Sequence, residues 1–172
     1  KPYTSLEQRQ PDMKSTHALL ISIRPRFVDA IFDGTKTVEL RRVKPRLQPG
    51  DLVVIFASGE TKGIVGAFEV AGVTSASPSR LWRQHNGGSG LSKAEYDRYF
   101  KGKIVGYAIK IERIWKLSTP ILLGTLRKRS AGFRPPQSYH YWTIEEIFRV
   151  GGDSLSSEIG RHRDFRQVAS FD

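Results

Sequence analysis

The stretch F-D-G-T-K-T-V-E-L-R-R, residues 32–42, restricts the fold of this chain most strongly. Gly34 is placed to end a helix, Lys36 follows in a turn, and the next residues alternate as in a strand. Alternation with a period of two separates a polar set from an apolar set: Thr37, Glu39 and Arg41 on one face, Val38 and Leu40 on the other. We interpret the polar face as one wall of an anion-binding cleft.

Apolar runs and turn signals elsewhere predict about six strands. They are expected at His17–Ile23, Thr37–Arg42, Leu52–Ala57, Gly63–Val73 and Lys103–Leu117, with an extended segment at 132–142. Short helices are expected at 25–34, 79–85, 92–100 and 144–149, and Pro120 is expected to start one more helical turn. No long alternation of strands and helices occurs. We therefore predict an α+β fold, a small mixed β-barrel with short peripheral helices.

The two ends of the chain and one internal stretch lack this periodicity. Residues 1–16 are predicted to form a flexible arm before a single domain at 17–149. Residues 150–172 are predicted to form a tail that is open to partial disorder. The glycine-rich stretch 86–90 is predicted to be a flexible loop.

The positive charge of the chain indicates an anionic partner. The 172 residues carry a formal net charge of +11, which favours polyanions through phosphate neutralisation. A basic surface that only aids solubility is the alternative, but the charges are clustered. One cluster lies between Arg24 and Arg46, and a second has no acidic residue in it: Arg127, Lys128, Arg129 and Arg134. Clusters that flank aromatic and glycine-rich segments are typical of nucleic-acid sites.

Other classes of site find little support in the sequence. The chain has no cysteine, and its histidines lack the spacing of a zinc site, so no metal or cofactor is expected. No apolar run approaches the roughly 18 residues that cross a bilayer, so no membrane partner is expected. We expect a cytoplasmic protein, or a nuclear one in a eukaryote.

Several blocks of residues resemble the ASCH-domain proteins, a branch of the PUA-like superfamily. The matching blocks are L-L-I-S-I-R-P-R-F-V-D-A-I-F-D-G-T-K-T-V-E-L-R-R (19–42), V-V-I-F-A-S (53–58), G-A-F-E-V (66–70), S-G-L-S-K-A-E-Y-D-R-Y-F-K-G-K (89–103), G-Y-A-I-K-I (106–111) and P-P-Q-S-Y (135–139). The resemblance implies a PUA-like barrel with a cleft beside the first helix and second strand, and binding of RNA or of a modified nucleotide.

The resemblance also implies an enzymatic alternative. Some ASCH proteins are similar to amidohydrolases that deacetylate acetylcytidine, and others are similar to ribonucleases. In the amidohydrolases a lysine of the G-x-K turn is catalytic, and Lys36 matches it. Glu39 replaces their partner threonine, Arg41 matches the arginine after it, and the stretch 86–90 offers no counterpart of their remote glutamate. Lys36 and Glu39 are therefore the candidate catalytic residues.

The candidate nucleic-acid-binding residues come from three segments. They are Arg24, Arg26, Lys36, Arg41, Arg42, Ser58, Gln137, Ser138 and Tyr139. Lys36 is open to three interpretations: a phosphate anchor, a catalytic base or nucleophile, or a turn residue in solvent. Glu39 is either a general acid or base, or a partner that neutralises and orients an arginine. The tail is a candidate surface for a protein partner.

Overall fold

The computed structural model describes residues 17–160. The arm predicted at 1–16 and the end of the tail, 161–172, lie outside the described residues. Within the described part, no helix is long and apolar enough to cross a membrane.

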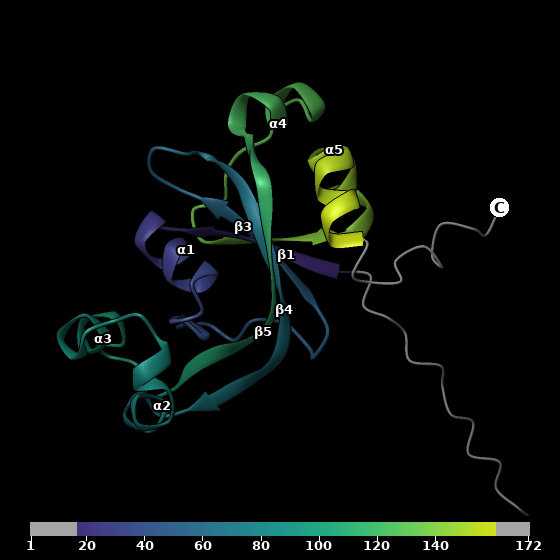
Figure 1. Cartoon of the computed structure of the whole chain (residues 1–172). Coiled ribbons are helices and arrows are strands. Elements are labelled where there is room, and N and C mark those ends of the chain that lie inside the picture. Colours follow the sequence, from purple (N-terminus) through teal and green to yellow (C-terminus); the bar gives the residue numbers. More distant parts are fainter. Residues whose placement is uncertain (1–16, 161–172) are drawn as a thin grey trace, which may run out of the picture.

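A six-stranded mixed sheet forms the centre of the molecule (Figure 1). The strands are β1 (His17–Ile23), β2 (Val38–Arg41), β3 (Leu52–Ala57), β4 (Gly63–Ala76), β5 (Gly106–Leu122) and β6 (Tyr139–Thr143). Their spatial order is β2-β5-β4-β3-β1-β6, in which β1 and β3 are parallel and the other neighbours are antiparallel. The predicted mixed sheet of about six strands is confirmed.

The sheet curls, and its two edge strands approach each other. The long pair β4 and β5 changes register between Ile64 and Gly66 and again on both sides of Val70, and such irregularities bend a sheet. A hydrogen bond of 3.2 Å from Arg41 Nη1 to Ser138 Oγ then links edge strand β2 to the segment that leads into edge strand β6. This closure places residues from distant parts of the chain around one recess.

Helix α1 (Pro25–Phe32) packs on one face of the sheet, beside that recess. Pro25 occupies its first turn, where the missing N–H costs nothing, and the chain leaves the helix through Gly34 at φ 84°. Val28 and Ile31 are buried in the cluster that the helix forms with β1, β3 and β4. The helix predicted at 25–34 is confirmed.

Two further helices pack around the end of the sheet that carries β2. They are α2 (Pro78–His85) and α3 (Lys93–Tyr99), and Ser92 and Glu95 form the predicted capping box of α3. Leu81, Tyr96 and Phe100 form a small core with Val38 and Leu40, the apolar face predicted for β2. This cluster fixes the position of the Lys36 turn.

The domain extends beyond the end predicted for it. Helix α5 (Ile144–Gly160) continues through a break at Gly152, where φ is 67°. Its buried residues Val150, Leu155 and Ile159 belong to the core on the other face of the sheet. The domain boundary predicted at residue 150 therefore lies within a helix. It was misplaced because Gly151 and Gly152 interrupt the helical pattern of the sequence.

Strand β5 also differs from its predicted limits. It runs from Gly106 to Leu122, and helix α4 (Leu123–Arg129) begins only after it. Pro120 lies within β5 and does not start a helical turn. The pairing of β4 with β5 passes from Lys116 to Ile121 across a register shift, and this irregularity accommodates a residue without an N–H.

Candidate functional site

A recess of about 580 Å³ opens between α1, α3, β2 and the end of β1. Five cationic and two acidic side chains contribute to its lining. The lining residues are Ser22, Ile23, Arg24, Arg26, Phe27, Lys36, Glu39, Leu40, Arg41, Leu91, Glu95, Arg98, Tyr99 and Gln137. The recess therefore combines a cationic wall with aromatic and amide groups.

Lys36 is the buried cation of the recess lining, and only 3% of its surface is exposed to solvent. Its Nζ donates a hydrogen bond of 2.7 Å to the carbonyl oxygen of Ser89 and lies 3.2 Å from Glu39 Oε2. The ring of Phe27 lies 5.2 Å from the same nitrogen. The burial excludes the interpretation of Lys36 as a turn residue in solvent.

The turn folds back so that Lys36 can reach Glu39. The Lys36 N–H donates to the carbonyl of Ala30 in α1 at 2.8 Å, and the Thr37 N–H donates to the carbonyl of Gly88 at 2.9 Å. Along an extended strand, residues three apart are separated by roughly 10 Å of backbone. Lys36 precedes the strand, and these two hydrogen bonds fix the turn in a conformation that brings the Lys36 ammonium to the Glu39 carboxylate.

The stretch 86–90 packs into the site in a defined conformation, and the prediction of a flexible loop there is wrong. It begins with the short 3-10 helix η1 (Asn86–Gly88), and Gly88 and Ser89 are buried. A Cβ on Gly88 would lie 2.1 Å from Thr37 Oγ1, so no larger residue fits without movement. The glycines allow the loop backbone to approach the Lys36 turn closely.

Glu39 bridges two cations of the recess, Lys36, which is buried, and Arg41, which is partly buried. Its Oε1 accepts a hydrogen bond of 2.9 Å from Arg41 Nη2, and its Oε2 lies beside Lys36. This geometry matches the interpretation of Glu39 as a partner that neutralises and orients an arginine. The three residues form a continuous network, which we call the Lys36–Glu39–Arg41 network.

Arg41 extends this network to the opposite edge of the sheet. Besides the hydrogen bond to Ser138, its guanidinium lies 5.7 Å from the ring of Tyr139. Its Nε is buried and has no hydrogen-bond partner among residues 17–160. A buried N–H without an acceptor is unfavourable, so a movement of the guanidinium that brings Nε to an acceptor, from a ligand or from solvent, would be favourable.

The rim of the recess carries an ion pair between α1 and α3. Arg26 Nη2 donates a hydrogen bond of 2.5 Å to Glu95 Oε1. The backbone N–H of Ser92, and after it the Arg26 side chain, lower the pKa of Glu95 to about 2. Arg24 and Arg26 are exposed, so both remain accessible to a ligand.

Tyr99 provides an aromatic wall that the sequence did not single out. Its hydroxyl donates a hydrogen bond of 3.0 Å to the carbonyl of Leu40, and burial raises the pKa of the phenol. Its neighbours Tyr96 and Phe100 are only 2% and 3% exposed and belong to the core. Only Tyr99 of this group of three lines the recess.

The segment before β6 is fixed against β1. The Ser22 hydroxyl donates to the carbonyl of Pro136 at 2.5 Å, and the Ser22 N–H donates to the carbonyl of Ser138 at 3.0 Å. Gln137 reaches the recess lining directly, whereas Ser138 and Tyr139 adjoin it through Arg41.

Two of the predicted residues lie elsewhere. Arg42 is exposed and does not contribute to the lining, because β2 ends at Arg41 and Arg42 lies in the bend that follows. The Ser58 hydroxyl donates to the carbonyl of Ile23 at 3.2 Å and fixes the end of β1. The residues missed were Ser89 and eight lining residues: Ser22, Ile23, Phe27, Leu40, Leu91, Glu95, Arg98 and Tyr99. Only Glu95 carried a sequence signal, its capping box.

Within residues 17–160, no group of three histidine or acidic side chains is arranged to hold a metal ion. The chemistry that this recess offers comes from ammonium, guanidinium, carboxylate, amide and phenol groups.

Comparison with known proteins identifies the family. The ASCH-domain model matches residues 21–114, more than half of the chain. The ASCH domain-containing ribonuclease of Zymomonas mobilis is 31% identical over 149 residues, which cover 87% of this chain and 97% of that protein. The large ribosomal subunit protein uL22 of Ureaplasma parvum is 28% identical over 73% of this chain, but only 41% of that protein is covered.

The fold agrees with the sequence matches. The crystal structure of ASCH from Zymomonas mobilis superposes with a TM-score of 0.72 at 29% identity, over 78% of this chain and 93% of that one. The predicted PUA-like fold is confirmed by this match. The chain belongs to the ASCH-domain family.

Proposed function

We propose that this protein binds RNA in the recess, with the Lys36–Glu39–Arg41 network as the recognition centre. The observation that carries the proposal is the buried Lys36 ammonium, fixed by Ser89 and Glu39 beside an arginine whose Nε lacks an acceptor. A preorganised donor set of this kind is suited to a phosphate oxygen or a base carbonyl.

The surroundings of the network support an RNA ligand. Five cations against two carboxylates leave the lining positively charged. Tyr99 presents a ring in the lining for stacking, and the Gln137 amide suits the edge of a base. Arg24 and Arg26 at the rim are placed to contact backbone phosphates.

The proposal is tested by titrating fluorescent oligoribonucleotides of mixed sequence, together with a panel of modified nucleotides. Lys36→Ala and Arg41→Ala should weaken binding by about tenfold or more, and affinity should fall steeply with salt. Arg42→Ala is the matched control, because it removes one charge outside the recess. Affinity that does not change with salt, or equal losses in Arg41→Ala and Arg42→Ala, would overturn the proposal.

Cleavage of the bound RNA is a second candidate function. It is favoured by the name of the Zymomonas mobilis relative, a ribonuclease that aligns over 87% of this chain. It is also favoured by the close pairing of Lys36 with Glu39. The Glu39 carboxylate can accept the proton of a hydroxyl that attacks the scissile phosphorus, the bond from phosphorus to the leaving oxygen breaks, and the Lys36 ammonium can stabilise the negative charge that develops.

Cleavage is tested by incubating the same oligoribonucleotides with protein and resolving the products by electrophoresis. We expect products from the unmodified chain and none from Lys36→Ala. Lys36→Arg keeps the charge but not the geometry, and it should bind RNA while cleaving poorly. Cleavage that survives Lys36→Ala would exclude this role of Lys36.

A further inference from the structure

A second group of exposed cations lies towards one end of the molecule, outside the recess. Backbone contacts connect the segments that carry it to the rim of the recess. This group comes from the turn between β3 and β4, from α4 and from the segment that follows α4: Lys62, Arg127, Lys128 and Arg134. None of the four forms an ion pair with any residue between 17 and 160. Glu60 is the acidic residue on the same turn.

Contacts in the structure join this group to the recess. A Cβ on Gly59 would lie 3.0 Å from the Pro25 ring, so the β3–β4 turn packs against the start of α1, between Arg24 and Arg26. The Lys62 carbonyl accepts a hydrogen bond of 2.9 Å from the Leu123 N–H at the start of α4. The turn therefore lies between the rim of the recess and α4.

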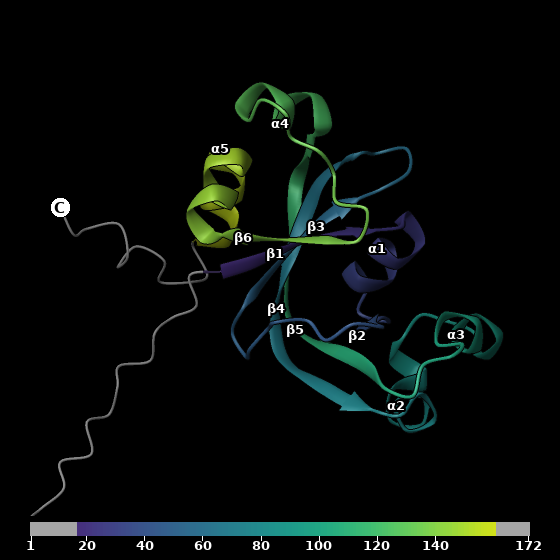
Figure 2. The same cartoon turned by 180° about the vertical axis from the view of Figure 1, so that it is seen from behind.

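The chain returns from α4 to the recess by a second route. The segment after α4 carries Arg134 and runs towards α1 before it enters β6 (Figure 2). Three residues after Arg134, Gln137 lines the recess. The segments that carry these exposed cations thus adjoin one another along the surface, and we call the set the basic track: Arg24, Arg26, Lys62, Arg127, Lys128 and Arg134.

The conformation of Lys62 is a separate indication. Within the described part of the chain, Lys62 is the non-glycine residue with a positive φ, at 45°. A left-handed lysine is strained relative to glycine, and strain of this kind concentrates at functional sites. Glycine or asparagine would fit the turn better but would lack the cation.

We propose that the basic track binds the phosphates of an RNA strand that continues beyond the nucleotide held in the recess. The inference rests on the proposed function, because it extends the ligand from the recess along the surface. Exposed cations, all but Arg26 without an ion pair to residues 17–160, suit a flexible phosphate backbone, which requires charge more than precise geometry. The partner is therefore a single-stranded RNA segment of several nucleotides.

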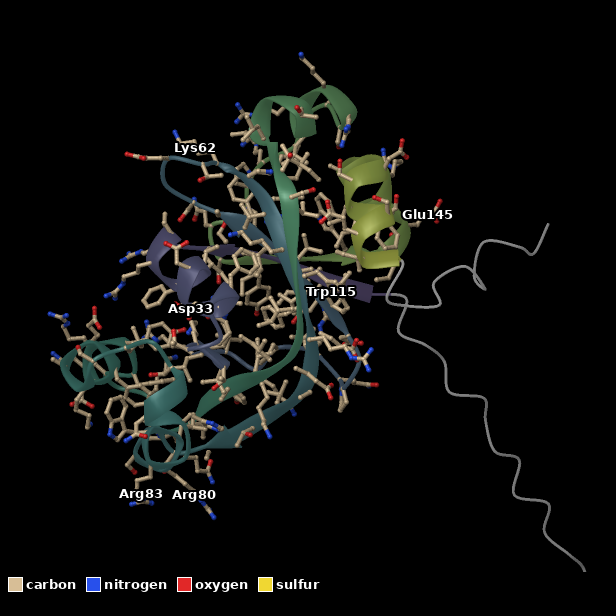
Figure 3. The ribbon with its side chains drawn as sticks, viewed as in Figure 1. Asp33, Lys62, Arg80, Arg83, Trp115 and Glu145 are labelled. Atoms are coloured by element: carbon tan, nitrogen blue, oxygen red, sulfur yellow. The ribbon has the colours of Figure 1, made fainter. Side chains whose placement is uncertain are left out.

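The test compares two charge-reversal variants that change the net charge equally. Arg127→Glu with Lys128→Glu alters the track, and Arg80→Glu with Arg83→Glu alters α2 at the opposite end of the molecule from Lys62 and α4 (Figure 3). Arg80 and Arg83 are exposed and form no ion pair within the described residues. Binding is measured for a mononucleotide and for oligoribonucleotides of about 4 and about 12 nucleotides, the range of single-stranded site sizes.

We expect the track variant to bind the longest RNA about tenfold or more weakly, with a shallower salt dependence, and to bind the mononucleotide as the unmodified chain does. The α2 variant should change both affinities little. Equal losses in the two variants would overturn the inference, and so would an affinity that does not rise with RNA length. A mononucleotide that fails to bind the unmodified chain would instead contradict the proposed recess.

Lys62→Gly gives a second, independent readout. The variant relieves the left-handed strain and should be at least as stable to thermal unfolding as the unmodified chain. Its affinity for the longest RNA should nevertheless fall. Unchanged affinity for that RNA would remove Lys62 from the track.

Discussion

The Lys36 ammonium donates a hydrogen bond to the carbonyl of Ser89, 53 residues further along the chain, and this bond joins the Lys36 turn to the glycine-rich stretch 86–90. Lys36 is thereby fixed in the recess together with Glu39, which also binds Arg41. The site consequently depends on three segments that are far apart in the chain: the turn before β2, the stretch 86–90 and the segment before β6.

Gly88→Ala should destabilise the Lys36 site. The added Cβ would lie 2.1 Å from Thr37 Oγ1, so the Thr37 side chain must rotate away or the backbone around it must move. We expect a loss of about 1–3 kcal/mol in the free energy of unfolding, together with weaker RNA binding. Gly87→Ala is the control, since its Cβ would meet no atom within 4 Å. Chemical denaturation of the two variants checks this, and equal stability of both would contradict the packing described here.

Glu39→Gln should leave two cations without their common counter-charge. Lys36 and Arg41 are nearly buried, with side chains 4% and 12% exposed, so their mutual repulsion is poorly screened. We expect the free energy of unfolding to fall by about 3 kcal/mol. In a double-mutant cycle with Lys36→Met, the second substitution should recover part of this loss. Additive losses would show that the pair does not interact.

Truncation after Arg149 should unfold the domain, because it removes part of the core. Val150, Leu155 and Ile159 are at most 1% exposed, and each buried aliphatic side chain contributes about 1.5–3 kcal/mol. Truncation after Gly160 retains these residues and should preserve the cooperative thermal transition. Circular dichroism distinguishes the two products, and a cooperative transition in the shorter one would contradict the position of α5.

Arg129→Ala should destabilise α5 at its break near Gly152. Arg129 Nη1 donates to the carbonyls of Val150 and Gly151 at 3.2 and 2.8 Å, where the helix changes direction before Gly152. Removing a charged donor from two partly buried acceptors should cost about 1.5–3 kcal/mol. Arg127→Ala removes a charge from the same helix without these contacts and should cost little. Thermal melts of the two variants provide the comparison.

The charge on Glu95 should persist to low pH. Its pKa falls from 4.5 to about 2 on folding, so its contribution to stability is complete above about pH 4.5 and is lost as the pH falls towards 2. Arg26→Ala should raise this pKa only partly, because the Ser92 N–H is the larger cause and remains. Carboxyl carbon shifts followed by NMR measure both values. A pKa near 4.5 in the unmodified chain would contradict the capping geometry.

Local patterns predicted much of the fold correctly. Alternation placed Val38 and Leu40 in the core, apolar runs located β1 and β3, and Ser92 with Glu95 marked the start of α3. These signals depend on neighbours in sequence, which is why they could be read without coordinates. The same alternation placed Glu39 and Arg41 together on the polar face of β2, and both line the recess.

The remainder depends on contacts between distant segments. Nothing near Gly88 or Ser89 indicates that their backbone packs on the Lys36 turn, and a glycine-rich stretch is equally typical of a flexible loop. The recess position of Tyr99 is set by the packing of α3, since Tyr96 on the same helix is core. The end of the domain was missed because Gly151 and Gly152 break the helical period.

The position of RNA relative to Arg41 tests the central claim most directly. The Nε–H of Arg41 gives its own signal in ¹⁵N-resolved NMR spectra, and Arg41→Lys assigns it. If RNA binds in the recess, this signal should shift and exchange more slowly with water when a short oligoribonucleotide is added, because Nε gains an acceptor. RNA that binds while the Arg41 signal stays unchanged would show that the ligand lies elsewhere on the protein.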